Sequence, residues 1–456
     1  MADGESRPWS VLYQDEAVEL DSIDRSPTVS IENILADGVK TDGDRPLVTT
    51  ILPNGSEKTL SYKEMAAASY AFARYLREDL KLQAGDVVAL QIPNCTSYAV
   101  AMLGIVRAGL IVSNVNPLYT PFETRRQLGD CKAKALVFID LFGDKIDEAV
   151  LGLNDFKLIK VSITDFFPPL RAAMLNFALK YVRRMVPKMS TPYTTFTDIV
   201  KIDITNGSKP LQYTNEQSTD DTNFLQYSGG TTGKSKGVKL SLASIVHNHM
   251  QVRSVAPDEF KNKNLTTILV MPLYHMAGFT VLMAGLLMHG HVVLVPSPRP
   301  LSNLKQAFEK YTINAFLGVN TLFAGLMKED WFVTNPPKIG LTFSGATALN
   351  SSVAEEWERL TGSKIYETYG MTEATAAVTW NPPGENMRTG SVGFPIPGTT
   401  VRILKDDSTW AQTGETGEIV VKGPQVMNGY FNAEDLNKNA FFDGWLRTGD
   451  IGYLDA

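Results

Sequence analysis

The strongest constraint on the fold is a glycine- and hydroxyl-rich run, Ser228-Gly229-Gly230-Thr231-Thr232-Gly233-Lys234-Ser235-Lys236-Gly237. Glycine lets backbone N–H groups approach an anion closely, and hydroxyl and lysine side chains add donors and positive charge. The run follows a strand-like segment at 223–227 and precedes Val238 and a helix-like segment at 242–252. We therefore expect a phosphate-binding loop between a strand and a helix.

The spacing of this run excludes a Walker A motif, which needs four residues between its first glycine and the Gly-Lys pair. Gly229 stands one residue too close to Gly233, and position 228 is serine. A flexible linker is the plain alternative, but linkers rarely carry two lysines and a threonine pair between a strand and a helix. The run is thus predicted to bind a nucleotide through a phosphate loop that differs from the Walker A loop of P-loop kinases.

Length and charge narrow the class of protein. A chain of 456 residues is too long for one compact core, so two or three subdomains are expected. The net charge of −6 gives no reason to expect a nucleic-acid partner. The chain has two cysteines, Cys95 and Cys131, a polar acidic start and no unbroken apolar stretch of membrane-spanning length. These features predict a cytoplasmic protein.

Strand-like and helix-like segments alternate along most of the chain, which predicts βαβ units and parallel sheets. Examples are the strands at 87–92, 110–115 and 135–139 and the helices at 98–108 and 121–131. The predicted fold is α/β, with two doubly wound subdomains and a small antiparallel β subdomain. The expected boundaries are 1–45 for an extended N-terminal arm, 46–215 and 216–392 for the α/β subdomains, and 393–456 for the β subdomain.

Residues 170–188 form a predicted basic amphipathic helix. Its apolar side chains fall near one helical face, and basic side chains surround them: Leu170, Met174, Phe177, Tyr181 and Met185 against Arg171, Lys180, Arg183, Arg184 and Lys188. Such a helix can lie on an anionic membrane surface. The alternative, a surface helix packed on its own domain, is favoured by the sequence.

The pattern Tyr-Ser-Gly-Gly-Thr-Thr-Gly-x-x-Lys-Gly-Val, which starts at Tyr227, resembles the phosphate loop of the adenylate-forming superfamily. That superfamily includes acyl-CoA synthetases, luciferases and peptide-synthetase adenylation domains. Further matches follow in order: a small-residue turn at 344–348, Tyr-Gly-x-Thr-Glu at 369–373 and Trp-Leu-Arg-Thr-Gly-Asp at 445–450. The resemblance implies ATP-binding residues Ser228, Gly229, Gly230, Thr231, Thr232, Gly233, Lys234, Lys236, Gly345, Ala346, Thr347, Glu367, Tyr369, Gly370, Met371, Thr372 and Asp450.

Roles follow from the same resemblance. Tyr369 is expected to contact adenine, Thr372 the α-phosphate, and Asp450 the ribose hydroxyls. Glu373, with Thr231, is the predicted magnesium site, because carboxylate oxygens suit this hard cation. Lys236, Thr372, Glu373 and His275 are the predicted catalytic residues.

A histidine among apolar residues, Pro272-Leu273-Tyr274-His275-Met276-Ala277-Gly278, is more often a satisfied core residue than a catalyst. In the superfamily the matching position lies between the carboxylate and the α-phosphate, so His275 is expected to orient the substrate acid. The predicted acyl pocket comprises His275, Met276, Gly278, Gly318, Val319, Asn320 and Thr321. An apolar pocket with few polar groups suits a fatty or aryl acid.

Details such as Gln226-Tyr227-Ser228 and Lys422-Gly423-Pro424 look most like long-chain fatty-acid–CoA ligases. The resemblance implies two steps, ATP-dependent formation of an acyl-AMP and transfer of the acyl group to CoA, with ATP, Mg²⁺ and CoA required. Three alternatives stay open: an aryl-acid (coumarate-type) CoA ligase, a ligase that passes the acyl group to a carrier protein, and a non-catalytic nucleotide-binding module.

The superfamily's C-terminal lid domain supplies a lysine that no residue here matches. The chain is therefore expected to be the large N-terminal domain, with impaired catalysis on its own.

Overall fold

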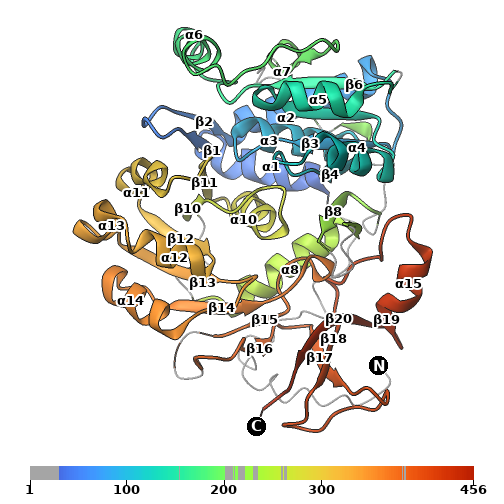
Figure 1. Ribbon diagram of the computed structural model, residues 1–456, viewed down its shortest axis with the longest axis vertical. Helices are drawn as coiled ribbons and strands as arrows, with labels where there is room; N and C mark the ends of the chain where they lie inside the picture. The colour runs from blue at the N-terminus through green and yellow to red at the C-terminus, as the bar shows by residue number, and fades with distance from the viewer. Residues whose placement is uncertain are drawn as a thin grey trace.

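The computed structural model describes residues 30–153, 155–200, 209, 211–213, 221–229, 235–257, 260, 264–382, 384 and 387–455. Two large sheets lie side by side, with a smaller sheet below them (Figure 1). The seven-stranded sheet has the order β7-β6-β5-β3-β4-β8-β9 and is parallel except for its last pair. Its strands are β3 (Val87–Gln91), β4 (Ile111–Asn114), β5 (Ala135–Ile139), β6 (Lys157–Val161), β7 (Thr194–Thr195), β8 (Phe224–Ser228) and β9 (Lys236–Leu240).

The nine-stranded sheet has the order β16-β15-β14-β13-β12-β10-β11-β1-β2 and is parallel from β1 to β14. Its strands are β1 (Pro46–Ile51), β2 (Glu57–Ser61), β10 (Thr266–Leu269), β11 (His291–Leu294), β12 (Ile313–Gly318), β13 (Ile339–Ser344), β14 (Ile365–Tyr369), β15 (Thr379–Trp380) and β16 (Phe394–Pro395). The third sheet is antiparallel, β17-β18-β20-β19, from β17 (Thr400–Leu404), β18 (Gly417–Lys422), β19 (Phe441–Phe442) and β20 (Trp445–Gly452). The predicted fold class is thereby confirmed.

Helices connect the strands and cover the sheets. They are α1 (Ile31–Asp42), α2 (Tyr62–Arg74), η2 (Tyr75–Asp79), α3 (Thr96–Arg107), α4 (Pro121–Asp130), η3 (Asp140–Phe142), α5 (Gly143–Val150), α6 (Pro169–Phe177), η4 (Ala178–Val182), α7 (Phe196–Ile199), α8 (Leu242–Val255), α10 (Met276–Leu287), η6 (Leu301–Leu304), α11 (Lys305–Lys310), α12 (Asn320–Leu326), α13 (Asp330–Thr334), α14 (Ser351–Thr361), η7 (Thr372–Ala374) and α15 (Glu434–Ala440). No helix among the described residues is both long and apolar enough to span a bilayer. Cys95 and Cys131 are free thiols in the interior.

Two expectations about segments are wrong. Residues 31–42, assigned to an extended arm, form α1, whose Ser30 side chain accepts a hydrogen bond from the Asn33 N–H and whose Ile31 and Leu35 are buried. Lys236 and Gly237, assigned to the phosphate loop, open β9, which returns antiparallel to β8. The sheets also do not follow the expected subdomain boundaries along the chain. Strands β1 and β2 belong to the nine-stranded sheet, and β8 and β9 belong to the seven-stranded one. The boundaries themselves stay predictions.

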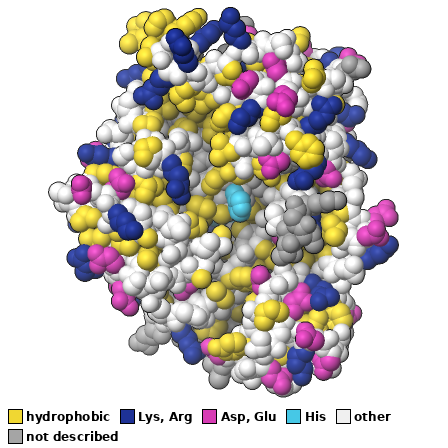
Figure 2. All heavy atoms as spheres, viewed as in Figure 1, with side chains coloured by type: hydrophobic (Ala, Val, Ile, Leu, Met, Phe, Trp, Pro, Cys, Tyr) yellow, Lys and Arg dark blue, Asp and Glu magenta, His cyan; other side chains and the backbone are white. Residues whose placement is uncertain are grey.

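The helix predicted over residues 170–188 forms as α6 and η4 but ends at Val182, and it stands at the top of the molecule, where yellow and dark-blue side chains gather (Figures 1 and 2). Its apolar face was expected to pack on the domain. The structure corrects this, because Leu170, Met174, Phe177 and Tyr181 are all at least 60% exposed.

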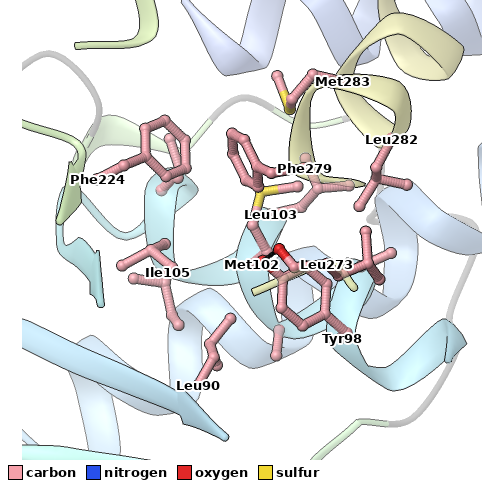
Figure 3. Packing of buried hydrophobic residues seen from close by; sticks show 14 of the residues in the cluster. Leu90, Tyr98, Met102, Leu103, Ile105, Phe224, Leu273, Phe279, Leu282 and Met283 are labelled. Carbon is pink, nitrogen blue, oxygen red and sulfur yellow. Dashed lines mark hydrogen bonds between the residues drawn. The ribbon is translucent and has the colours of Figure 1, made fainter. Parts of the chain in front are cut away.

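The main core lies between the two large sheets and centres on α3, in which every residue is buried (Figure 3). Phe224 of β8 and Phe279 of α10 meet edge to face there, with ring centroids 4.9 Å apart. The Tyr98 hydroxyl donates to Asn114 Oδ1 of β4 at 2.7 Å and lies 3.0 Å from the Leu273 carbonyl before α10. These contacts fix the loop that precedes α10 against the seven-stranded sheet.

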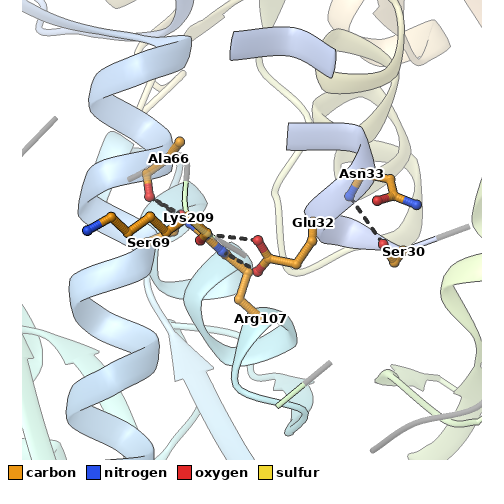
Figure 4. A network of polar contacts seen from close by, with 7 residues as sticks. All are labelled: Ser30, Glu32, Asn33, Ala66, Ser69, Arg107 and Lys209. Atoms are coloured by element: carbon orange, nitrogen blue, oxygen red, sulfur yellow. Dashed lines mark hydrogen bonds and ion pairs between the residues drawn. The ribbon is translucent and has the colours of Figure 1, made fainter. Parts of the chain in front are cut away.

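A buried ion pair fastens α1 to α3 (Figure 4). Arg107, 1% exposed, donates from Nε to Glu32 Oε1 at 2.7 Å and from a terminal nitrogen to Oε2 at 3.0 Å. Nη1 also donates to the Ala66 carbonyl and the Ser69 hydroxyl on α2, and Nη2 reaches the Lys209 carbonyl at 3.4 Å. This two-pronged geometry satisfies a charge that burial would otherwise make very costly.

Candidate active site

A cavity of about 270 Å³ lies between α8, α10 and the carboxyl ends of β12, β13 and β14. Open α/β sheets bind ligands at this end of their strands. Most lining side chains are apolar, and those predicted from the sequence are His275, Met276, Gly318, Gly345, Ala346, Gly370, Met371 and Thr372. Residues from segments about a hundred positions apart therefore share one wall.

The glycines at this wall leave no space for a side chain. A Cβ at Gly370 would fall 1.4 Å from the Ala376 carbonyl oxygen, and one at Gly345 would fall 2.9 Å from the Thr368 hydroxyl. The neighbouring Ala346 takes a positive φ of 66°. The chain thus presents backbone, rather than side chains, at the predicted adenine side of the site.

Glu373 is held by two hydroxyl donors from distant segments. Ser228 Oγ on β8 and Tyr430 Oη each lie 3.0 Å from Glu373 Oε1, and the side chain is 6% exposed. Both hydrogen bonds end on the same oxygen, Oε1, and Oε2 forms no hydrogen bond with the described residues. Burial, followed by the charge of Glu373, raises the pKa of Tyr430, which keeps this hydroxyl protonated as a donor.

The segment that carries Tyr430 is hydrogen-bonded to β9, the strand that follows the predicted phosphate loop. The Lys239 N–H donates to the Gly429 carbonyl at 3.0 Å, and the Phe431 N–H donates to the Gly237 carbonyl at 2.7 Å. Lys236 Nζ lies 5.3 Å from the centre of the Tyr430 ring. Tyr430 therefore contacts both the predicted metal ligand and the predicted phosphate-binding lysine.

A second carboxylate contact joins the nine-stranded sheet to the small one. The Tyr369 hydroxyl on β14 donates to Asp450 Oδ2 on β20 at 2.6 Å. Burial raises the pKa of Tyr369, and its bond to Asp450 acts in the same direction. The residues predicted to meet adenine and ribose are thus neighbours in space.

His275 immediately precedes α10, at the end of a loop that two amides fix. The Asn94 side chain donates to the Met271 carbonyl at 2.9 Å and accepts from the Leu273 N–H at 2.8 Å, and the Gln226 side chain donates to the Tyr274 carbonyl. The His275 ring opens to the cavity, while the surrounding protein partly removes it from water and lowers its pKa. This shift favours the neutral form of the imidazole.

The remaining predicted residues are placed as follows. Val319, Asn320, Thr321 and Gly278 do not line the cavity; Asn320 instead accepts a hydrogen bond from the Asn350 N–H at 3.0 Å. Glu367, Thr347, Gly229 and Lys236 also lie outside its lining. Gly230, Thr231, Thr232, Gly233 and Lys234 lie outside the described residues. Among the described residues, no group of three or more His, Cys, Asp or Glu side chains is arranged to hold a metal ion.

Sequence reasoning missed the deep part of the cavity, which α8 and α10 enclose. His249 lines it, and burial, with a smaller effect of Arg253, lowers its pKa to about 4. The available signal was the composition of α10, Met276–Leu287, which has no charged residue on any face. A helix apolar all round must bury two sides, here one against the core and one toward the cavity.

Comparisons with known proteins agree with this geometry. The family model described as AMP-binding enzyme matches residues 35–431. A long-chain-fatty-acid–CoA ligase of Haemophilus influenzae is 37% identical over 439 residues, which cover 95% of this chain and 76% of that protein. A ligase of the same description from Bacillus subtilis is 30% identical, covering 98% of this chain and 78% of its own length.

Solved structures of the same fold match as well. The anthranilate CoA ligase AuaEII in complex with anthranoyl-AMP superposes with a TM-score of 0.80 at 20% identity, covering 94% of this chain and 77% of that one. ATP-bound MatB from Rhodopseudomonas palustris superposes with a TM-score of 0.71 at 25% identity, covering 93% and 76%. The motif resemblance is confirmed: the chain belongs to the AMP-binding enzyme family.

Proposed function

We propose that this protein activates a medium- or long-chain fatty acid with ATP, forming an acyl-adenylate, and transfers the acyl group to CoA. The observation that carries the proposal is the continuity of one apolar cavity. It begins at His275 and Thr372, next to the predicted nucleotide site, and continues between α8 and α10. An acid bound there would place its carboxylate beside the α-phosphate and its tail among apolar side chains. Two relatives named long-chain-fatty-acid–CoA ligases support this substrate class.

Each polar residue has a role in this proposal. Lys236 and the backbone N–H groups of the phosphate loop contact the ATP phosphates, and Thr372 contacts the α-phosphate that the substrate carboxylate attacks. His275, neutral because its pKa is lowered, donates a hydrogen bond that orients this carboxylate. Asp450 accepts from the ribose hydroxyls. The residues mainly position the reactants and stabilise negative charge.

Glu373 fits a magnesium ligand, because two hydroxyls hold Oε1 in place and Oε2 makes no hydrogen bond with the described residues. Mg²⁺ commonly binds through one or two carboxylates together with substrate phosphates, so one protein carboxylate suffices. When bound, the ion would neutralise charge on the phosphates. Ser228 and Tyr430 keep the carboxylate oriented.

We also propose that residues 1–456 alone bind Mg·ATP and acid but form little thioester, since no residue matches the lysine expected from the resemblance. Contact with a membrane surface through residues 170–188 is a separate proposal that does not depend on this reaction.

A thermal-shift titration tests the substrate class. Ligands that bind the native state raise the melting temperature by mass action. With Mg·ATP present, saturated fatty acids of increasing length are expected to raise it progressively, and coumarate is expected to have no effect. Larger stabilisation by coumarate would favour the aryl-acid alternative, and no response to any acid would favour a nucleotide-binding module.

A second experiment addresses the acyl acceptor. Mass spectrometry of the products of a chain extended by the family's C-terminal domain, offered CoA or a carrier protein, is expected to show acyl-CoA. An acylated carrier protein alone would contradict the CoA assignment.

A further inference from the structure

The helix formed by α6 and η4 is apolar on its outer side as well as its inner side. Toward the domain, Leu179 packs against the main core, and Asn176 Oδ1 accepts from the Thr164 hydroxyl at 2.6 Å. Toward solvent, Leu170 is 77% exposed, Met174 67% and Phe177 60%. The helix is therefore anchored by one face while the opposite face presents large apolar side chains to water.

The outer face continues along η4 and just past its end. Tyr181 is 60% exposed, Val182 71% and Met185 45%, and the Phe177 and Tyr181 rings lie 5.1 Å apart, centre to centre. None of the described residues covers these side chains, since each remains exposed with the rest of the described chain in place. Large contiguous apolar patches of this kind mark interaction sites more often than plain surface.

Every charged residue between 169 and 190 is basic. The five positions are Arg171, Lys180, Arg183, Arg184 and Lys188, and all are exposed. None forms an ion pair with an acidic residue in the described part of the chain. This cluster contrasts with the overall charge of −6, because no acidic residue lies within residues 169–190.

We propose that this surface docks on a bilayer that contains anionic lipids. Leu170, Met174, Phe177 and Tyr181 enter the boundary between headgroups and acyl chains, and the basic side chains contact lipid phosphates. Charge complementarity selects this occupant. An isologous contact between two copies of the chain would bring two basic clusters together, whereas anionic lipid neutralises them.

Vesicle co-sedimentation of the full chain tests the proposal without ATP or a fatty acid, so its result is independent of the ligase reaction. The protein is expected to bind vesicles of equimolar phosphatidylcholine and phosphatidylglycerol, to bind phosphatidylcholine vesicles weakly, and to be released by high salt. Combining Lys180→Gln, Arg183→Gln and Arg184→Gln should weaken binding by on the order of 100-fold, from about 1 kcal/mol for each basic residue. Phe177→Glu should abolish it.

Matched control variants separate this surface from general effects of charge or hydrophobicity. The combination of Lys328→Gln, Lys338→Gln and Lys364→Gln removes three exposed basic residues from the α12–α14 region. Phe122→Glu places the same acid at a phenylalanine that is 73% exposed on α4. Both control proteins are expected to bind as the unchanged chain does, and melting temperatures of all variants should be close, because every replaced side chain is exposed.

Three results would overturn the proposal. The first is equal binding to the two vesicle types, which would remove the role of anionic lipid. The second is an equal effect of the helix variants and their controls. The third is a concentration-dependent dimer in sedimentation analysis that Phe177→Glu abolishes while no vesicle binding is detected, which would assign the surface to a second copy of the chain.

Discussion

Replacing Tyr430 by phenylalanine tests how the chain prepares its predicted magnesium ligand. The change removes one oxygen atom, which donates to Glu373 Oε1 over 3.0 Å, and leaves the ring beside Lys236 in place. A hydrogen bond to a charged group contributes about 1.5–3 kcal/mol. If that energy orients the carboxylate for the metal, its loss weakens magnesium-dependent ATP binding roughly ten- to a hundredfold.

Calorimetric titration of ATP, with Mg²⁺ and again with excess EDTA, isolates this effect as the ratio of the two affinities. Tyr430→Phe is expected to lower that ratio. Tyr369→Phe is a matched control, because it also removes a hydroxyl that donates to a carboxylate, in this case Asp450. The control is expected to change both affinities by a similar factor and to leave the ratio unaltered.

A second donor to the same oxygen sharpens the test. Ser228→Ala should lower the ratio as Tyr430→Phe does, and the double variant should show a loss different from the sum of the two, because both donors orient one carboxylate. An unchanged ratio in Tyr430→Phe, or an equal change in Tyr369→Phe, would refute the view that Tyr430 positions Glu373 for the metal.

Three further changes probe the core, a buried acid and the cavity. Arg107→Met leaves the Glu32 carboxylate buried without its partner and should lower the free energy of unfolding in urea by about 3–5 kcal/mol, and a loss below about 1 kcal/mol would contradict the buried-pair assignment. Burial raises the pKa of Asp165 from 3.8 to about 7, so the folded state retains a proton that the unfolded state releases in this range. The free energy of unfolding should therefore fall by up to roughly 4 kcal/mol as the pH rises from about 4 to about 7, whereas that of Asp165→Asn should not show this fall. Parallel pH profiles of the two unfolding free energies would refute this. Each methylene added to the acid should tighten binding in a displacement assay about fourfold until the cavity is filled, and a profile flat from the shortest acids would contradict an acyl role for the cavity.

Local sequence pattern predicted the elements whose partners are parallel neighbours. The apolar runs at 87–92 and 135–139 form β3 and β5, because a strand buried on both faces reads as a continuous apolar segment. The pattern did not reveal β9, since Lys236 and Gly237 look like the end of a loop until β8 supplies a pairing edge. It also did not show that β1 pairs with β11, more than two hundred residues later, because that pairing depends on long-range packing.

In the candidate site, too, local motifs predicted one part and long-range packing determines the rest. Motifs identified the wall formed by Gly345, Gly370 and Thr372, because tight turns restrict residue type strongly. The contact between Tyr430 and Glu373 spans 57 positions and depends on how the 427–431 segment pairs with β9, so no local pattern encodes it. The exposed face of α6 was misassigned for a related reason: periodicity shows that one face is apolar but does not show what covers it.

We propose that one site holds ATP beside the paired strands β8 and β9 and a fatty tail between α8 and α10. A crystal structure with a non-hydrolysable acyl-adenylate analogue tests it most directly. We predict that the adenine lies against Gly345 and Tyr369, that the ribose hydroxyls contact Asp450, and that the acyl chain fills the cavity past His275. An acyl chain bound elsewhere, with the cavity between the two helices empty, would contradict the account.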